Sequence, residues 1–97
     1  RENFLHFYRD GDESLYIPAS SFLGVDAQGD TSTLEVHFQS PAGDDTDAKV
    51  TLGFTGDHKD ACEALANALA SDKLVVTVAD AKADIFLHPF NAIDSVA

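Results

Sequence analysis

The chain has 97 residues, of which 17 are acidic and 6 are basic, giving a formal net charge of −11. Such a charge repels phosphate backbones and anionic membrane surfaces, so it argues against direct binding to nucleic acid or to a membrane. With 44% hydrophobic residues, seven Phe, one Cys and neither Met nor Trp, the sequence predicts one globular domain over residues 1–97, without an internal disulfide.

The first third of the chain is rich in residues that form strands and turns. Residues 3–9 predict an aromatic strand, residues 10–12 a turn, and residues 14–17 the returning strand of a hairpin. Pro18 has no backbone N–H to donate, which predicts either the end of this strand or a place at a sheet edge. Residues 22–25 form a short apolar segment that is typical of a strand or a bend.

Two segments in the middle of the chain alternate almost perfectly between apolar and polar residues. Their apolar positions are Leu34, Val36 and Phe38 in the first segment and Val50, Leu52 and Phe54 in the second. A period of two predicts antiparallel strands that each have one buried and one polar face. The polar face is typical of a solvent-exposed surface and of a subunit interface alike.

The next segment predicts a helix over residues 57–71. Asp57 is the expected N-cap, and Asp60 lies in the first turn, where the helix dipole favours a negative charge. At about 100° per residue, an apolar stripe is expected on one side of the helix. Its members are Ala61, Cys62, Leu65, Ala68 and Leu69. The small alanines would let the helix lie close against a sheet.

The rest of the chain predicts further strands at residues 73–79 and 85–88, where Pro89 interrupts the pattern, and a short edge piece at residues 91–96. The order of these elements indicates an α+β fold. We expect a single antiparallel β-sheet of about 6–7 strands with one helix, at about residues 57–71, packed on one face.

The spacing of His58 and Cys62, four residues apart on the predicted helix, suits a pair of metal ligands or a histidine-activated thiolate. However, Cys62 falls on the apolar stripe, where burial makes a thiol unreactive. A structural zinc site needs about four ligands, and the chain has no second Cys. We therefore expect both residues to have structural roles.

Two acidic segments, residues 10–13 and residues 44–47, could offer oxygen ligands to a divalent cation. Neither segment has the spacing of an EF-hand loop, and acidic residues are common in turns. The sequence leaves open whether these segments bind divalent cations.

Two histidines on or near predicted strands, His37 beside Glu35 and His88 at the end of the last clear strand, are the remaining candidates for acid–base chemistry. Neither has a partner that the sequence implies. The chain also lacks a Walker A motif, a dinucleotide-binding glycine pattern and a nucleophile elbow. The sequence thus assigns no catalytic, cofactor-binding or metal-binding residue, and we expect no enzyme.

Aromatic residues crowd the two ends of the chain. They are Phe4, Phe7, Tyr8, Tyr16, Phe22, Phe86 and Phe90. Because neighbouring residues of a strand point to opposite faces, Phe7 and Tyr8 cannot both be buried in one core. The outward aromatics are typical of an ordinary surface or of a subunit interface.

Three stretches of the sequence carry a family resemblance. They are Tyr16-Ile17-Pro18-Ala19-Ser20 running into Phe22-Leu23-Gly24, the strand Val50-Thr51-Leu52, and Gly56-Asp57-His58-Lys59-Asp60-Ala61-Cys62-Glu63-Ala64-Leu65-Ala66 before a valine-rich strand. In these stretches the chain resembles small proteins of marine tailed phages, cyanophages especially. None of the motifs is catalytic. The resemblance implies a structural role or association with the virion.

These observations lead to three hypotheses of function. The first is a non-enzymatic structural or assembly module, soluble in the host cytoplasm or in the virion if of phage origin, that forms a homo-oligomer through a sheet face or edge. The alternative is an acidic binding module that engages a basic protein or mimics nucleic acid. The third is an enzyme or metalloprotein that uses His58, Cys62 and a carboxylate. The acidity is also typical of adaptation to salt.

Overall fold

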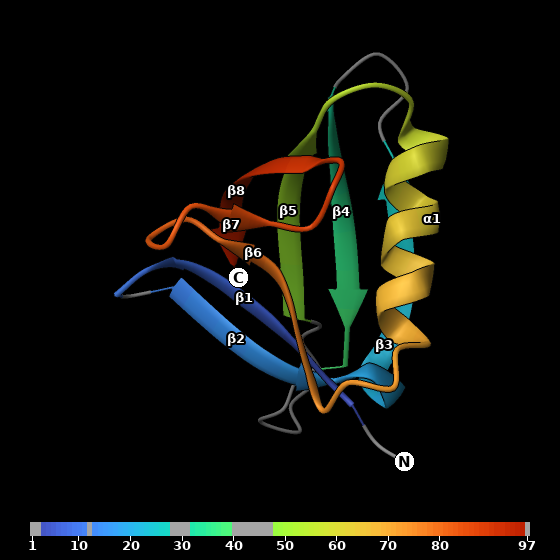
Figure 1. Cartoon of the computed structure of the whole chain (residues 1–97), viewed down its shortest axis with the longest axis vertical. Coiled ribbons are helices and arrows are strands. Elements are labelled where there is room, and N and C mark those ends of the chain that lie inside the picture. The colour runs from blue at the N-terminus through green and yellow to red at the C-terminus, as the bar shows by residue number, and fades with distance from the viewer. Residues whose placement is uncertain (1–2, 12, 28–31, 40–47, 97) are drawn as a thin grey trace.

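The computed structural model of the chain describes residues 3–11, 13–27, 32–39 and 48–96, which form eight strands in two four-stranded sheets and one α-helix (Figure 1). The fold is α+β, as predicted, but the prediction of a single antiparallel sheet of about 6–7 strands is wrong. We call the two sheets the N-terminal sheet and the central sheet.

The N-terminal sheet has the strand order β2-β1-β6-β7. Its strands are β1 (Phe4–Asp10), β2 (Glu13–Pro18), β6 (Val75–Asp80) and β7 (Ile85–Phe86). The predicted hairpin of β1 and β2 is confirmed, and β2 ends at Pro18 on the edge of the sheet. In contrast to the antiparallel prediction, β6 lies parallel to β1.

The central sheet has the order β3-β4-β5-β8, and all its neighbouring strands are antiparallel. Its strands are β3 (Phe22–Ala27), β4 (Thr33–Phe38), β5 (Ala48–Phe54) and β8 (Phe90–Val96). The alternation correctly predicted its buried face, because Leu34 pairs with Leu52 and Val36 with Val50, and all four are buried.

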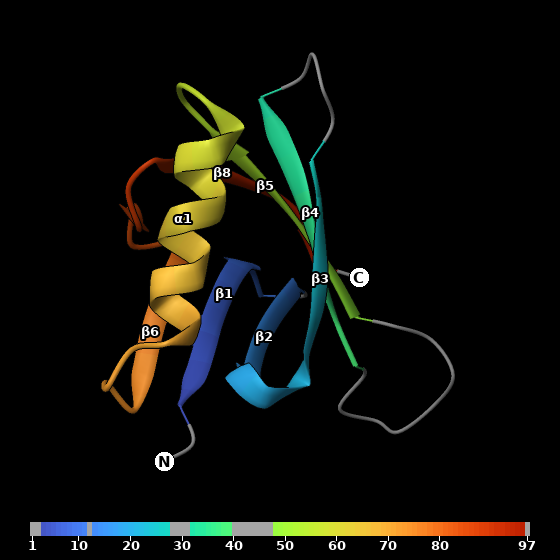
Figure 2. The same cartoon turned by 90° about the vertical axis from the view of Figure 1, so that its right-hand side faces the viewer.

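A 3-10 turn and the helix are two of the connections that carry the chain from one sheet to the other. After β2, the 3-10 turn Ala19–Ser21 redirects the chain from the N-terminal sheet to the central sheet (Figure 2). The helix α1 (His58–Leu69) later returns it from β5 to β6. A period of two identifies the buried face of a strand but not the sheet to which the strand belongs, which is why the single-sheet prediction failed.

The C-terminal strands also differ from the prediction. The segment 85–88 contains only the two-residue strand β7. The piece expected at residues 91–96 does lie at a sheet edge, paired with β5, but it is the full strand β8 rather than a short piece. The predicted interruption at Pro89 is confirmed, because Pro89 lies between the end of β7 and the start of β8. The peptide bond between His88 and Pro89 is cis.

The helix α1 spans His58–Leu69 and is therefore shorter than the predicted 57–71. Its N-cap is Asp57, as expected, and the Asp57 carboxylate accepts a hydrogen bond of 2.9 Å from the Lys59 N–H. The buried side of the helix consists of Ala61, Leu65 and Ala68, while Cys62 and Leu69 are half-buried beside them. The helix lies at one side of the sheets, next to β6 (Figures 1 and 2).

The core lies between the two sheets and the helix. Phe7 of β1 and Phe38 of β4 are fully buried, and their ring centroids are 5.8 Å apart across the sheets. Among the described residues, no helix combines the length and hydrophobicity that crossing a bilayer requires.

Candidate functional site

The predicted pair His58 and Cys62 lies on the first turns of α1. His58 is exposed at the helix start, and Cys62 is half-buried against the core. Within the described ranges, the structure brings together no group of three or more His, Cys, Asp or Glu side chains that could hold a metal ion. Within these ranges, His58 and Cys62 therefore have no third metal ligand beside them, and a metalloprotein site would require one.

In the acidic segment 10–13, the carboxylates of Asp10 and Glu13 already have partners. The Arg9 guanidinium donates to Asp10 at 2.8 Å and to Glu13 at 2.6 Å. Glu13 also accepts a bond of 2.9 Å from the Val96 N–H of β8. Asp12 and the second acidic segment, residues 44–47, lie outside the described residues.

The outer side of the central sheet is polar. Glu35 there lies 3.7 Å from His37 Nε2 and 3.7 Å from Lys49 Nζ. These three side chains are partly exposed, and ion pairs of this kind contribute at most about 1 kcal/mol to stability. The cluster is what the polar alternation predicted, and its exposure is typical of a solvated surface.

The outer side of the N-terminal sheet is aromatic. As predicted, Phe7 and Tyr8 point to opposite faces, since Phe7 is fully buried and Tyr8 is half-buried on the outside. The His6 ring stacks on Tyr16 with centroids 4.2 Å apart and lies 6.4 Å from Tyr8. His6 Nδ1 is 3.4 Å from Thr77 Oγ1 of β6. This side of the sheet thus presents a continuous set of rings that span β1 and β2.

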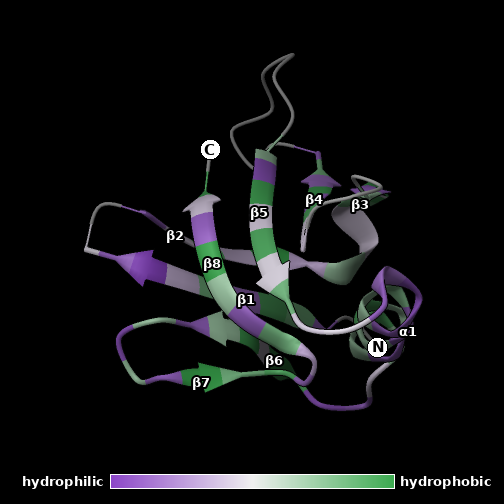
Figure 3. Cartoon of the chain, turned by 90° about the horizontal axis from the view of Figure 1, so that it is seen from above, coloured by the Kyte–Doolittle hydropathy of each residue, from purple (hydrophilic) through white to green (hydrophobic). Residues whose placement is uncertain are grey.

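Aliphatic residues extend this aromatic side across β6 and β7. Val75, which pairs with Phe4, is 42% exposed, and Ile85, which pairs with Asp80, is 55% exposed. Figure 3 shows the hydrophobic colour of β7 at the margin of the molecule. We call this surface the aromatic face. It consists of Phe4, His6, Tyr8, Tyr16, Val75 and Ile85.

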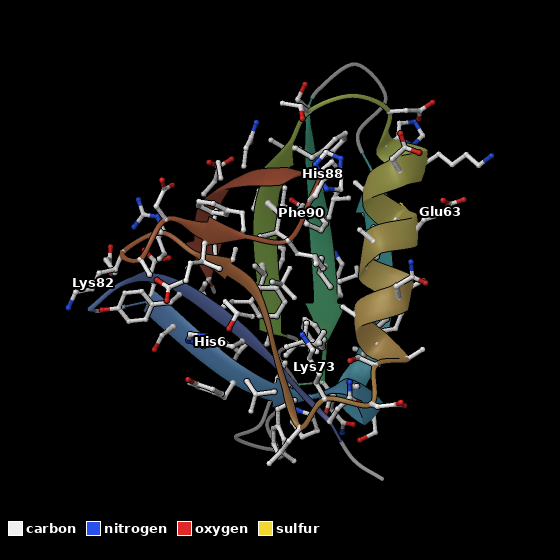
Figure 4. The ribbon with its side chains drawn as sticks, in the orientation of Figure 1. His6, Glu63, Lys73, Lys82, His88 and Phe90 are labelled. Carbon is white, nitrogen blue, oxygen red and sulfur yellow. The ribbon has the colours of Figure 1, made fainter. Side chains whose placement is uncertain are left out.

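A groove of about 290 Å³ runs between α1 and β6. Its lining, here named the α1–β6 groove, is Ala64, Asn67, Ala68, Ser71, Lys73, Val76, Leu87 and His88. Figure 4 places His88 and Lys73 toward opposite ends of the space between β6 and α1. The lining contains four apolar residues and no carboxylate, which sets it apart in so acidic a chain.

The edge of β6 beside this groove is open. The Phe4 N–H donates to the Leu74 carbonyl at 2.8 Å, so the backbone carbonyl of Leu74 points toward β1. Because backbone groups alternate along a strand, the N–H and C=O groups of Val75 and Thr77 point away from β1. Beyond β6, the short strand β7 pairs with Ala79 and Asp80, and the Leu87 N–H after it donates to the Val78 carbonyl at 2.9 Å. Within the described part of the chain, Val75–Thr77 have no strand neighbour on that side, and we call this segment the β6 edge.

A second hollow, of about 380 Å³, lies at the end of the aromatic face and is lined by Tyr8, Asp80, Lys82 and Ala83. It has one acidic and one basic side chain, without a nucleophile beside a base.

The sequence did not predict the open β6 edge or the α1–β6 groove. The only signals there were the apolar run Leu74–Val76 and the interruption at Pro89, and neither shows which strands become neighbours. Comparisons of the chain with protein-family models, with curated proteins and with solved structures found no match.

Proposed function

We propose that this chain is a non-enzymatic structural or assembly module that associates with further copies of itself through the N-terminal sheet. The observation that carries the proposal is the concentration of exposed apolar side chains there. Tyr16, Val75 and Ile85 belong to the aromatic face, and Leu74 directly precedes β6. Apolar surface that is gathered in one region marks an interaction site more often than scattered residues do.

The chemistry of this surface suits a second copy. The aromatic face carries little charge for a chain of net charge −11, and Asp80, which pairs with both Tyr8 and Ile85, is the carboxylate that its strand register places there. Two copies can therefore bury this apolar surface, and the overall repulsion between them falls as salt screens it. Association through this sheet is expected to survive high salt, unlike a contact made of ion pairs.

The alternative, an acidic module for a basic partner, requires carboxylates gathered on one face. Exposed or half-buried carboxylates of the described residues instead lie on both sheets and on the helix. Examples are Asp10, Asp26, Glu35, Asp60, Glu63 and Asp94. This distribution favours self-association. The resemblance to small proteins of marine tailed phages agrees with a structural role, and phage origin stays part of the proposal.

The test is the native mass of the full chain, measured by light scattering on a sizing column at low and at high salt. We expect an oligomer whose share of the protein rises, or stays constant, as salt increases. A monomer at both salt concentrations would contradict the proposal. Complexes with a basic protein that dissociate as salt rises, formed by an otherwise monomeric chain, would support the acidic binding module instead.

A further inference from the structure

We propose that the second copy binds along the β6 edge. In this arrangement two β6 strands pair antiparallel about a two-fold axis, and Leu74 of each subunit enters the α1–β6 groove of the other. The inference rests on the proposed self-association and specifies the surface that carries it.

The backbone of the β6 edge is suited to such a pairing. Val75 and Thr77 direct their N–H and C=O groups outward, and β7 ends before it reaches them. An exposed strand edge is a template for another strand unless charges, Pro or a bulge protect it. The β6 edge consists of two valines and a threonine, which favour strands, and it has neither a charge nor Pro; the bulge of β6 lies at its end, between Thr77 and Ala79.

The two-fold axis that suits this edge passes near Val75. There, Val75 and the partner subunit's Val75 exchange two N–H to carbonyl hydrogen bonds, because both carry outward backbone groups. This register places Leu74 opposite the partner subunit's Val76. Val76 lines the α1–β6 groove, so the exposed leucine meets an apolar lining.

Each subunit thus offers both halves of the contact. Leu74 is 56% exposed, and the groove beside it is lined by Ala64, Ala68, Val76 and Leu87. A surface that contains both a projecting apolar side chain and an apolar groove is self-complementary, as a two-fold interface must be. Burial of Leu74 would add the hydrophobic stabilisation that a pairing of only three residues lacks.

The local charge also favours a second copy over other occupants. Between Asp72 and Asp80 the only charged residue is Lys73, and the groove lining contains no carboxylate. Two copies therefore approach along this edge without placing carboxylates opposite one another. The edge strands of the central sheet, β3 and β8, have the exposed Asp26 and Asp94 instead.

The first experiment compares two leucines with the same exposed fraction. Leu74 on the β6 edge and Leu23 on β3 are each 56% exposed, so Leu74→Asp and Leu23→Asp add the same charge at similar cost to the folded monomer. By light scattering, we expect Leu74→Asp to weaken association about tenfold or more, because it would bury an unpaired carboxylate in the partner's groove. Leu23→Asp should leave the association constant near that of the unmodified chain.

The second experiment is oxidative cross-linking in a Cys62→Ser background. A hydrogen-bonded antiparallel pair has Cα atoms about 5.5 Å apart, within the range that a disulfide accepts. Val75→Cys should therefore form a covalent dimer on a non-reducing gel. Leu23→Cys, at an exposed position on β3 of the central sheet, should cross-link far more slowly.

The outcomes separate this inference from the proposed function. If the unmodified chain is a monomer, the proposed function fails and the inference fails with it. If the chain is an oligomer but both leucine variants weaken association equally, or Leu23→Cys cross-links as fast as Val75→Cys, only the β6 edge is overturned.

Discussion

Asn3 shows how much a single polar side chain can contribute to a small core. It is buried, and its Nδ2 donates a hydrogen bond of 3.1 Å to the Ala68 carbonyl near the end of α1. The backbone carbonyl of Asn3 accepts a hydrogen bond of 2.8 Å from the Ala19 N–H. One residue before β1 therefore connects the helix end to the turn between the two sheets, which satisfies buried polar groups at both places.

We expect Asn3→Ala to lower the free energy of unfolding by about 1–3 kcal/mol, because the Ala68 carbonyl loses its side-chain partner. The measurement is urea denaturation followed by far-UV circular dichroism. Asn91→Ala, at an exposed position of β8, is the matched control and should change stability little. Equal midpoints for the two variants would show that the Asn3 bond does not contribute to stability.

At the scale of one element, the packing of α1 against the sheets depends on one narrow apolar side of the helix. Leu65 is 1% exposed, whereas Glu63, two residues earlier, points away from the sheets (Figure 4). The alanines on either side of Leu65 along this stripe let the helix approach the sheets closely. Because these neighbours are small, Leu65 supplies most of the apolar volume that the helix buries.

The variant Leu65→Asp should therefore leave the chain largely unfolded. An unpaired carboxylate in the core costs several kcal/mol, comparable with the stability of a domain of this size. Glu63→Ala should stay within about 0.5 kcal/mol of the unmodified chain. Thermal unfolding by circular dichroism distinguishes the two, and a folded Leu65→Asp would mean that another side of α1 faces the core.

At the scale of the whole molecule, β8 joins the two sheets. It pairs with β5 in the central sheet and also packs against β1 and β6 of the N-terminal sheet. Its Val96 N–H donates to Glu13 of β2. The buried residues of both sheets and of α1 form one continuous cluster. The two sheets should accordingly lose their structure together.

We expect a single cooperative unfolding transition at low protein concentration. Tyr8 and Tyr16 both lie in the N-terminal sheet, so tyrosine fluorescence reports on that sheet, while far-UV circular dichroism also detects α1. The two denaturation curves should coincide, as they do in two-state unfolding. Separate midpoints would indicate that the sheets unfold as independent units.

The sequence by itself determined the features that depend on short-range periodicity and local chemistry. The cap at Asp57, the buried stripe of α1 and the inward positions of β4 and β5 follow from residues within a few places of one another. The opposite orientation of Phe7 and Tyr8 follows from the same alternation. The exposed aromatic positions could thus be anticipated before their neighbours in space were known.

Only the tertiary structure decided how the strands are distributed between two sheets, that β6 lies parallel to β1, and that β8 is a full strand. It also decided that β7 is too short to cover the β6 edge, which places Leu74 beside an apolar groove. The physical reason is that the pairing of strands depends on contacts between residues far apart in the chain. A valine-rich segment has the same alternation whether it lies in the middle of a sheet or at an open edge.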